Sequence, residues 1–205
     1  VSELKVNFDF SKEKLDISDV VSLLFYFGYL TIKDQEFSKS YTFKIPNKVI
    51  DEVYGQYYLN ILSEYNIEVT NDNINNILRS LIKESKIDVL CEYTSKLLRE
   101  ADNRIYIGLK EKDIQILMYA ILSGHREINV RLEYPSNDNY IDMVIFQNEY
   151  VKDNILIELK YIKKSEYNEK IYNEKLNEAK QQVNKYIQDE RINKDSLKKY
   201  IVIFI

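Results

Sequence analysis

The chain has 205 residues, of which 45% are hydrophobic and 30% charged, and its formal net charge is −4. This composition is typical of a folded globular protein and excludes a strongly basic protein that coats nucleic acid. The single cysteine (Cys91) excludes an internal disulfide, and because His125 is the only histidine, zinc sites built from several Cys and His are excluded as well.

The first hundred residues are predicted to be mainly helical. A helix is expected from Ile17, capped by Asp19 and stopped by Gly28. Its apolar residues recur at helical spacing, at Val20, Leu23, Leu24 and Phe27. Residues 29–34 and 39–47 then alternate in the manner of two strands, which indicates a hairpin.

A second helix is expected over 47–65, with Asn47 as its cap, and residues 72–100 predict one or two further helices. The order of a helix, a hairpin and another helix resembles a small winged-helix unit. We therefore expect residues 1–100 to form a mainly helical, winged-helix-like region.

The pattern changes near Ala101, where we place the start of a second domain covering residues 101–205. Its elements alternate between helical and strand-like periodicity. They are a helix at 110–124, strands at 127–134, 140–146 and 154–162, a long amphipathic helix at 168–190 and a strand at 198–205. This order predicts an α/β domain with a mixed sheet.

Charged residues interrupt two of these apolar strands. Because alternate residues share a face of a strand, Glu158 and Lys160 lie opposite the apolar face of their strand. Asp142 likewise shares a face with Val144 and Phe146 in the preceding strand. One interpretation is a solvent-facing side of an antiparallel sheet. The other is a site between neighbouring strands, which the apolar neighbours of Asp142 favour.

A third acid, Glu111, falls on the apolar stripe of the preceding helix. An acid in the first turn favours the helix dipole, but the dipole does not explain its position on the apolar side. Two or three carboxylates form a typical site for Mg²⁺. A nearby Lys160 can position or deprotonate an attacking water, or stabilise charge on phosphorus. We expect Lys160→Ala to abolish phosphodiester cleavage and to leave the fold intact.

Asp142, followed by the run Ile157-Glu158-Leu159-Lys160, resembles the PD-(D/E)XK nuclease superfamily. The resemblance implies a restriction-endonuclease-like α-β-β-β-α-β core with a mixed sheet. It also implies catalytic roles for Asp142, Glu158 and Lys160, and a Mg²⁺ or Mn²⁺ ion held by Glu111, Asp142 and Glu158.

The long helix contributes a second element of the resemblance. Gln182 and Tyr186 resemble the Q-x-x-x-Y element of exonuclease-type members, which implies contacts to nucleic acid, and Lys163 and Lys164 are expected to add phosphate contacts. The alternative interpretation is that Tyr186 belongs to the core and that Gln182 has no functional partner.

One segment departs from the family pattern. Members usually carry Gly-Arg shortly before the strand-two Asp, whereas this chain has Asn139 and Tyr140. The departure concerns substrate contacts near Asp142 more than metal binding. Glu133, on the preceding strand, is an alternative third acid.

The resemblance implies a nuclease that hydrolyses phosphodiester bonds, with DNA as the expected substrate. The alternative is a nuclease-fold module without efficient catalysis that binds nucleic acid or protein. The first hundred residues also resemble the segment that follows an AAA-ATPase-like domain in some microbial proteins. We therefore expect such a domain N-terminal to this chain. The short apolar runs predict no membrane span, and the single cysteine suits a reducing compartment, so we expect a cytoplasmic location.

Overall fold

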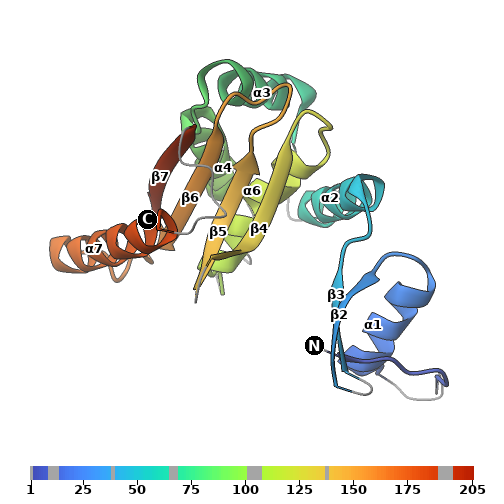
Figure 1. The fold of residues 1–205 in the computed structure, drawn as a ribbon. Coiled ribbons are helices and arrows are strands. Elements are labelled where there is room, and N and C mark those ends of the chain that lie inside the picture. Colours follow the sequence, from blue (N-terminus) through green and yellow to red (C-terminus); the bar gives the residue numbers. More distant parts are fainter. Residues whose placement is uncertain are drawn as a thin grey trace. The chain divides into compact units, whose positions relative to one another are not determined.

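The computed structural model describes residues 2–8, 14–37, 40–64, 69–100, 108–136, 139–188 and 196–205. The chain divides into two compact units, Val1–Tyr54 and Gly55–Ile205. The division falls within helix α2 (Lys48–Ser63), and Figure 1 labels the helices and strands of both units except β1. Each unit is described separately below.

The first unit is a small antiparallel sheet with one helix. Its elements are β1 (Ser2–Glu3), α1 (Ile17–Tyr26), β2 (Thr31–Phe37) and β3 (Ser40–Lys44), and the strand order is β1-β3-β2. The pairing of β2 with β3 confirms the expected hairpin. Whether the region is winged-helix-like stays a prediction.

Helix α1 begins one turn earlier than its expected cap. Asp16 is the N-cap, and its side chain accepts the Asp19 N–H, while the Asp19 side chain accepts the Asp16 N–H in return. The prediction of Asp19 as the cap is therefore wrong, because Asp19 is the acidic third residue of a reciprocal capping box. The cap of α2 is as expected, since the Ile50 N–H donates to Asn47 Oδ1 at 3.1 Å.

The second unit contains a four-stranded mixed sheet with the strand order β4-β5-β6-β7. Strands β4, β5 and β6 are antiparallel neighbours, and β7 runs parallel to β6. The strands are β4 (Asn129–Ser136), β5 (Asn139–Phe146), β6 (Asn154–Tyr161) and β7 (Leu197–Phe204). The helices are α3 (Asn71–Glu84), α4 (Asp88–Glu100), α6 (Glu111–Ser123) and α7 (Glu169–Tyr186). The α/β class and the mixed sheet are thus as expected.

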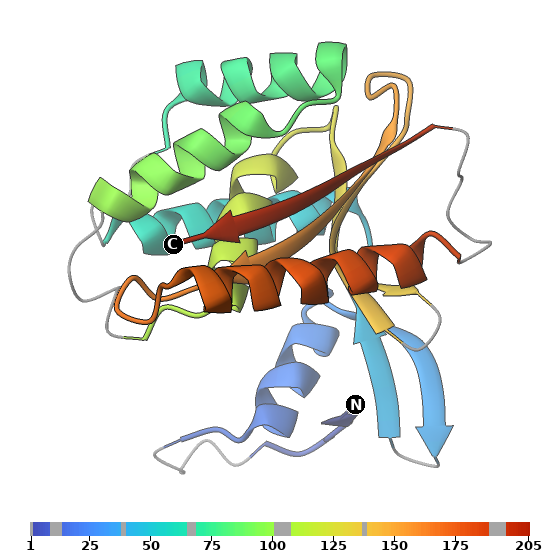
Figure 2. The same ribbon diagram turned by 90° about the vertical axis from the view of Figure 1, so that its left-hand side faces the viewer.

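The two faces of this sheet carry separate hydrophobic clusters. The larger cluster joins the sheet to α3, α4 and α6, and the smaller one joins it to α7. Figure 1 and Figure 2 show α7 and α6 on different sides of the strands. Alternation along β6 matches the prediction, because Ile155, Ile157 and Leu159 belong to the larger cluster and Leu156 to the smaller.

Helices α3 and α4 share their core with the sheet. Ile77 and Leu97 pack in the same cluster as Met143 and Leu159. The predicted domain start at residue 101 lies outside the described residues, and a functional division at that point stays a prediction.

Candidate active site

Strands β5 and β6 separate at the end where the charged residues lie. Their pairing covers three residues of each strand, from Ile145 opposite Ile155 to Met143 opposite Ile157. The pairing of β4 with β5 continues beyond this point as far as Ser136 and Asn139. Past Ile157, the β6 backbone therefore lacks its ladder partner on the β5 side.

Two carboxylates replace that partner. The Leu159 N–H donates to Asp142 Oδ2 at 2.7 Å, and the Tyr161 N–H donates to Glu111 Oε2 at 3.0 Å. Leu159 and Tyr161 are two residues apart, so their N–H groups point to the same edge of β6. A buried backbone N–H without a partner is costly, and each carboxylate satisfies one. Asp142 and Glu111 are thereby brought to one edge of the strand.

Glu158 and Lys160 form a buried ion pair on the α7 face of β6. Lys160 Nζ lies 2.7 Å from Glu158 Oε1, and the exposed fractions of the two side chains are 6% and 1%. Lys160 Nζ also lies 3.9 Å from Glu111 Oε1. The lysine therefore connects acids from β6 and α6.

The second carboxylate oxygen of Glu158 lacks a partner like the one that Lys160 gives to the first. Glu158 Oε2 is buried and has no donor in hydrogen-bond geometry among the described residues, although the Tyr186 hydroxyl lies close enough to lower the Glu158 pKa. A buried, charged acceptor without a donor is strongly unfavourable unless a cation or a water completes it. Glu158 thus has an oxygen available for a further ligand.

The buried acids have raised pKa values. Burial, followed by the charge of Glu158, raises the pKa of Asp142 to about 7, although the Leu159 N–H and the Lys160 charge oppose the rise. Burial also raises the pKa of Glu158, against the opposing hydrogen bond and charge of Lys160. Close carboxylates with raised pKa values are stabilised in their ionised form by a bound cation.

Burial acts in the opposite direction on Lys160, where it favours the neutral amine. The hydrogen bond and charge of Glu158, together with the charges of Glu111 and Asp142, outweigh burial and raise the Lys160 pKa. Lys160 is therefore a permanent cation at neutral pH. It can donate hydrogen bonds but cannot act as a base in this state.

A divalent cation fits part of this arrangement. No three His, Cys, Asp or Glu side chains among the described residues are grouped so as to hold a metal ion. The incomplete Glu158 Oε2 and the mutually repelling Asp142 and Glu158 nevertheless suit a cation held by two carboxylates and completed by water. Glu111 bonds the Tyr161 N–H instead, and its role as a metal ligand stays a prediction.

Gln115 is a site residue that the sequence pattern does not single out. It lies on α6 four residues after Glu111, only 3% of its surface is exposed, and its Nε2 donates to Asp142 Oδ1 at 2.8 Å. Residues 114 and 116–118 around it are apolar. The signal that could have found it is a polar amide on a helix that is otherwise apolar at these positions.

Glu133, the alternative third acid, lies on β4 between Leu132 and Tyr134, which pair with Met143 and Ile141 on either side of Asp142. Its side chain is 44% exposed and its carboxylate lies 3.6 Å from Lys112 Nζ. Its backbone has the positive φ of 48°, which is strained for a residue with a Cβ. Among the described contacts it pairs with Lys112, whereas Glu111 bonds within the site.

The long helix α7 places Tyr186 and Gln182 differently. Tyr186 is 1% exposed, and its hydroxyl donates to the Tyr140 carbonyl at 2.9 Å. Burial and the charge of Glu158 raise the Tyr186 pKa. Gln182 is half-buried, and its Oε1 accepts no bond from the described residues. Tyr186 is therefore a core residue whose hydroxyl lies beside the site. This agrees with the alternative interpretation of the sequence, in which Tyr186 belongs to the core.

Lys163 and Lys164 are exposed in the turn that follows β6. Lys164 lines a pocket together with Arg99 of α4 and Tyr161, the residue whose N–H Glu111 accepts. Two cations thus border a largely apolar pocket at the end of β6. This placement suits an anionic ligand that also has an apolar part.

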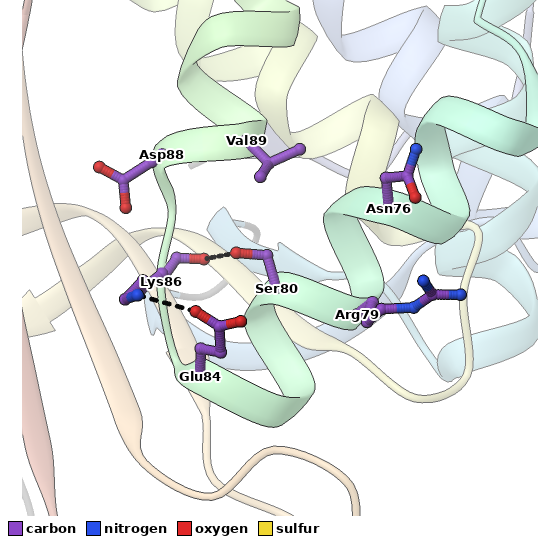
Figure 3. A pocket seen from close by; sticks show the side chains of 7 residues that line it. All are labelled: Asn76, Arg79, Ser80, Glu84, Lys86, Asp88 and Val89. Atoms are coloured by element: carbon purple, nitrogen blue, oxygen red, sulfur yellow. Dashed lines mark hydrogen bonds and ion pairs between the residues drawn. The ribbon is translucent and has the colours of Figure 1, made fainter.

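A further pocket, shown in Figure 3, lies where α3 meets α4. Lys86 Nζ pairs with Glu84 Oε2 at 2.8 Å, and the Ser80 hydroxyl donates to the Lys86 carbonyl at 3.2 Å. Asp142, Glu158 and Lys160 do not line it. The pocket is thus distinct from the candidate active site.

A comparison with known protein families finds a match in the C-terminal part of the chain. Residues 109–205 match the family model of the PD-(D/E)XK nuclease superfamily. The match supports a PD-(D/E)XK nuclease superfamily domain that contains every candidate site residue named above. Comparisons with curated proteins and with solved structures found no match. No helix in the described ranges has the length and apolar character needed to cross a membrane.

Proposed function

We propose that this PD-(D/E)XK domain is a nuclease that hydrolyses phosphodiester bonds in DNA and depends on Mg²⁺ or Mn²⁺. The observation that carries the proposal is the buried, incomplete Glu158 Oε2 in an ion pair with Lys160 and in the field of Asp142. A cation favours the ionised form of buried carboxylates in this arrangement, and a divalent ion that they hold can act on a phosphodiester.

Each residue has a distinct proposed role. Asp142 and Glu158 hold the metal, with Glu111 assisting. The bound ion supplies Lewis-acid polarisation of the phosphodiester and neutralises the two acids. Lys160, as a permanent cation, donates hydrogen bonds that orient the attacking water or stabilise negative charge on the phosphate oxygens.

The nucleic acid is proposed to approach along the end of β6. Lys163 and Lys164 contact phosphates, and the pocket bordered by Arg99 and Lys164 adds a second cationic contact. The unused acceptor of Gln182, its Oε1, suits a donor such as a base N–H or a metal-bound water. The Tyr186 ring is buried and its hydroxyl donates to the Tyr140 carbonyl, so any contact that Tyr186 makes to the substrate uses the hydroxyl oxygen. Lys163, Lys164 and Arg99 supply the phosphate contacts. Phosphate contacts of this kind position a strand and make its binding dependent on salt.

The decisive experiment incubates the protein with linear, circular and single-stranded DNA in Mg²⁺ or Mn²⁺, and in EDTA. Cleavage is expected only with metal, and Asp142→Asn is expected to abolish it. The matched control is Asp72→Asn, which makes the same change at an exposed residue in the first turn of α3. Equal cleavage with metal and with EDTA would contradict the proposed mechanism.

A binding experiment tests the substrate contacts separately. In Ca²⁺, which supports binding without turnover, replacing Lys163 and Lys164 by Ala is expected to lower the salt dependence of DNA affinity by up to about one unit of log–log slope per lysine. Lys170→Ala, which changes an 85% exposed lysine on α7, serves as the control. Gln182→Ala is expected to weaken DNA binding without lowering the melting temperature.

A module that binds without efficient catalysis is the second candidate. Two observations favour it: the described residues form no three-ligand metal group, and Lys160 is already engaged by Glu158. Asn139 and Tyr140, which replace the family's Gly-Arg, also favour a module without efficient catalysis. DNA binding that is equal in metal and in EDTA, with no cleavage in either, would establish this alternative.

The wider context belongs to the proposal as well. An AAA-ATPase-like domain N-terminal to this chain rests on the resemblance of residues 1–100, and a cytoplasmic location rests on the cysteine content. Nuclease assays on the intact protein with and without ATP would test whether such a domain regulates cleavage.

A further inference from the structure

A buried amide beside Asp142 has no role in packing that an apolar side chain could not fill better. Gln115 is 3% exposed and lies on the face of α6 that carries Ile114, Leu117 and Met118, all of which are buried. Burying an amide costs free energy unless its groups are hydrogen-bonded. The presence of Gln115 therefore needs a local explanation.

The hydrogen bonds of Asp142 provide one. Gln115 Nε2 donates to Oδ1 at 2.8 Å, and the Leu159 N–H donates to Oδ2 at 2.7 Å. Each carboxylate oxygen is therefore held by one donor, from a helix on one side and from the neighbouring strand on the other. Two donors on different oxygens prevent the carboxylate from rotating.

The chemistry of the two groups also fixes the orientation of the amide. The ionised carboxylate that a bound cation favours only accepts hydrogen bonds, so in that state the NH₂ of Gln115 faces Asp142 and its Oε1 faces away. Gln115 Oε1 is buried, and no donor to it is found among the described residues. One half of the amide is thus used on Asp142, and the other half is available to a water.

We propose that Gln115 is a positioning residue, which holds the Asp142 carboxylate in the orientation that binds the divalent cation. This inference rests on the proposed function, because it requires that Asp142 binds metal. Residues that hold a metal ligand by hydrogen bonding typically change metal affinity by about 10- to 100-fold when removed. The effect of Gln115 is expected within that range.

The test uses Gln115→Met in the full chain. Methionine nearly matches glutamine in size and suits an apolar surrounding, but it cannot donate to Asp142. Mn²⁺ affinity is measured without DNA by electron paramagnetic resonance of the free ion, and the expected result is a loss of about tenfold or more. Met118→Leu, a volume-conserving change on the same buried helix face, should leave Mn²⁺ affinity unchanged.

A second measurement separates positioning from a purely structural role. If Gln115 acts through Asp142, excess Mn²⁺ should restore cleavage to Gln115→Met but not to Asp142→Asn. A structural role would lower the melting temperature in EDTA without raising the Mn²⁺ concentration required. If Gln115→Met does not fold, Gln115→Asn replaces it, since the shorter amide cannot span the same distance and should show the same loss.

The possible failures are distinct. Wild-type protein that binds no Mn²⁺ would overturn the metal site and the role of Gln115 together. Wild-type protein that binds Mn²⁺, with Gln115→Met binding it equally well, would overturn the positioning role alone and leave the proposed nuclease function standing.

Discussion

The two units of this chain bury different kinds of residue. In the unit Val1–Tyr54, the buried side chains among the described residues are Asp19 and Ser22, both polar. In the unit Gly55–Ile205, a hydrophobic cluster runs from Ile77 to Phe204. Among the described residues, buried apolar side chains therefore form a core in the second unit, whereas the first unit buries only polar side chains.

Both units also contain a lysine paired with acids, but in different surroundings. Lys5 pairs with Asp16 and Asp19 at the start of α1; the Lys5 and Asp16 side chains are 31% and 55% exposed, whereas the Asp19 side chain is 4% exposed. Lys160 pairs with Glu158 where both side chains are almost fully enclosed. An exposed pair contributes little to stability, whereas a buried acid that loses its partner is strongly destabilising. Buried charges in the second unit are therefore retained at a cost, which is consistent with use in a reaction.

The largest expected effect comes from breaking the buried pair. Lys160→Met leaves Glu158 buried without its cation and should lower the free energy of unfolding by about 3–5 kcal/mol. Urea unfolding in EDTA, followed by circular dichroism, measures it. This outcome differs from the expectation that removing the lysine leaves the fold intact, because the sequence does not show that Glu158 is completely buried.

Two comparisons check this prediction. Lys5→Met should produce a smaller shift in the urea midpoint, because Asp19, although buried, keeps the Asp16 N–H as a donor and the Lys5 and Asp16 side chains are partly exposed. The double variant Glu158→Leu with Lys160→Met should regain most of the lost stability. If Lys160→Met and Lys5→Met shift the midpoint equally, burial of the pair does not govern its contribution.

Truncation of a large apolar side chain should have a different effect on stability in each unit. Leu122 is fully buried in α6, and Leu122→Ala should cost about 2–5 kcal/mol through lost burial and the cavity left behind. Phe27 is 71% exposed after α1, and Phe27→Ala should change stability by at most about 0.5 kcal/mol. The same urea experiment measures both. A large effect of Phe27→Ala would mean that this side chain is covered in solution.

These contrasts show which features are readable in the sequence. Local periodicity predicts the helix of α1, the hairpin and the strands of the mixed sheet, because hydrogen bonding within an element follows from the residues of that element. Burial does not follow from periodicity alone. Val20 and Phe27 occupy the apolar stripe of α1, yet 43% and 71% of their surfaces are exposed.

The candidate site shows the same limit. Strand alternation places Glu158 and Lys160 together on one face, because their separation is fixed by the backbone. The bonds from Gln115 to Asp142 and from Tyr161 to Glu111 join residues that are 27 and 50 positions apart. They depend on how far β5 and β6 separate, and no local pattern encodes that separation.

The pH dependence of folding stability in acid should have opposite signs for one acid in each unit, Asp142 and Asp16. The Asp142 pKa is raised to about 7, so in the folded protein Asp142 binds a proton between that value and its unfolded pKa. Stability in EDTA should therefore rise as pH falls from about 7 towards 4, by at most about 1.4 kcal/mol per pH unit for this one proton. Asp142→Asn should reduce this slope, as thermal melts across the pH range would show.

Asp16 should behave in the opposite way. Its hydrogen bond from Lys5 lowers its pKa, so the stability that it contributes is present above its unfolded pKa and is lost as pH falls through its lower folded value. Asp16→Asn should reduce the pH dependence of the melting temperature, and it should do so only in strong acid. A wild-type melting temperature that falls steadily from pH 7 to pH 5 would contradict the raised pKa of Asp142.

Two residues with positive φ, one in each unit, give a further contrast. Gly28 follows α1 with φ of 78°, and a Cβ added there would meet no atom within 4 Å. Gly28→Ala should therefore cost about 1–2 kcal/mol from backbone conformation alone. Glu133 has φ of 48° in β4, so Glu133→Gly should relieve its strain and stabilise the protein by up to about 1 kcal/mol, less the greater chain entropy of glycine.

Glu133→Ala is the matched control for this last prediction. It removes the exposed contact with Lys112, as Glu133→Gly does, but it keeps a Cβ at the strained position. Alanine should therefore leave the melting temperature near that of the wild type, and glycine should raise it above alanine. If glycine at 133 melts below alanine, the strain in β4 is smaller than the entropy of the glycine chain.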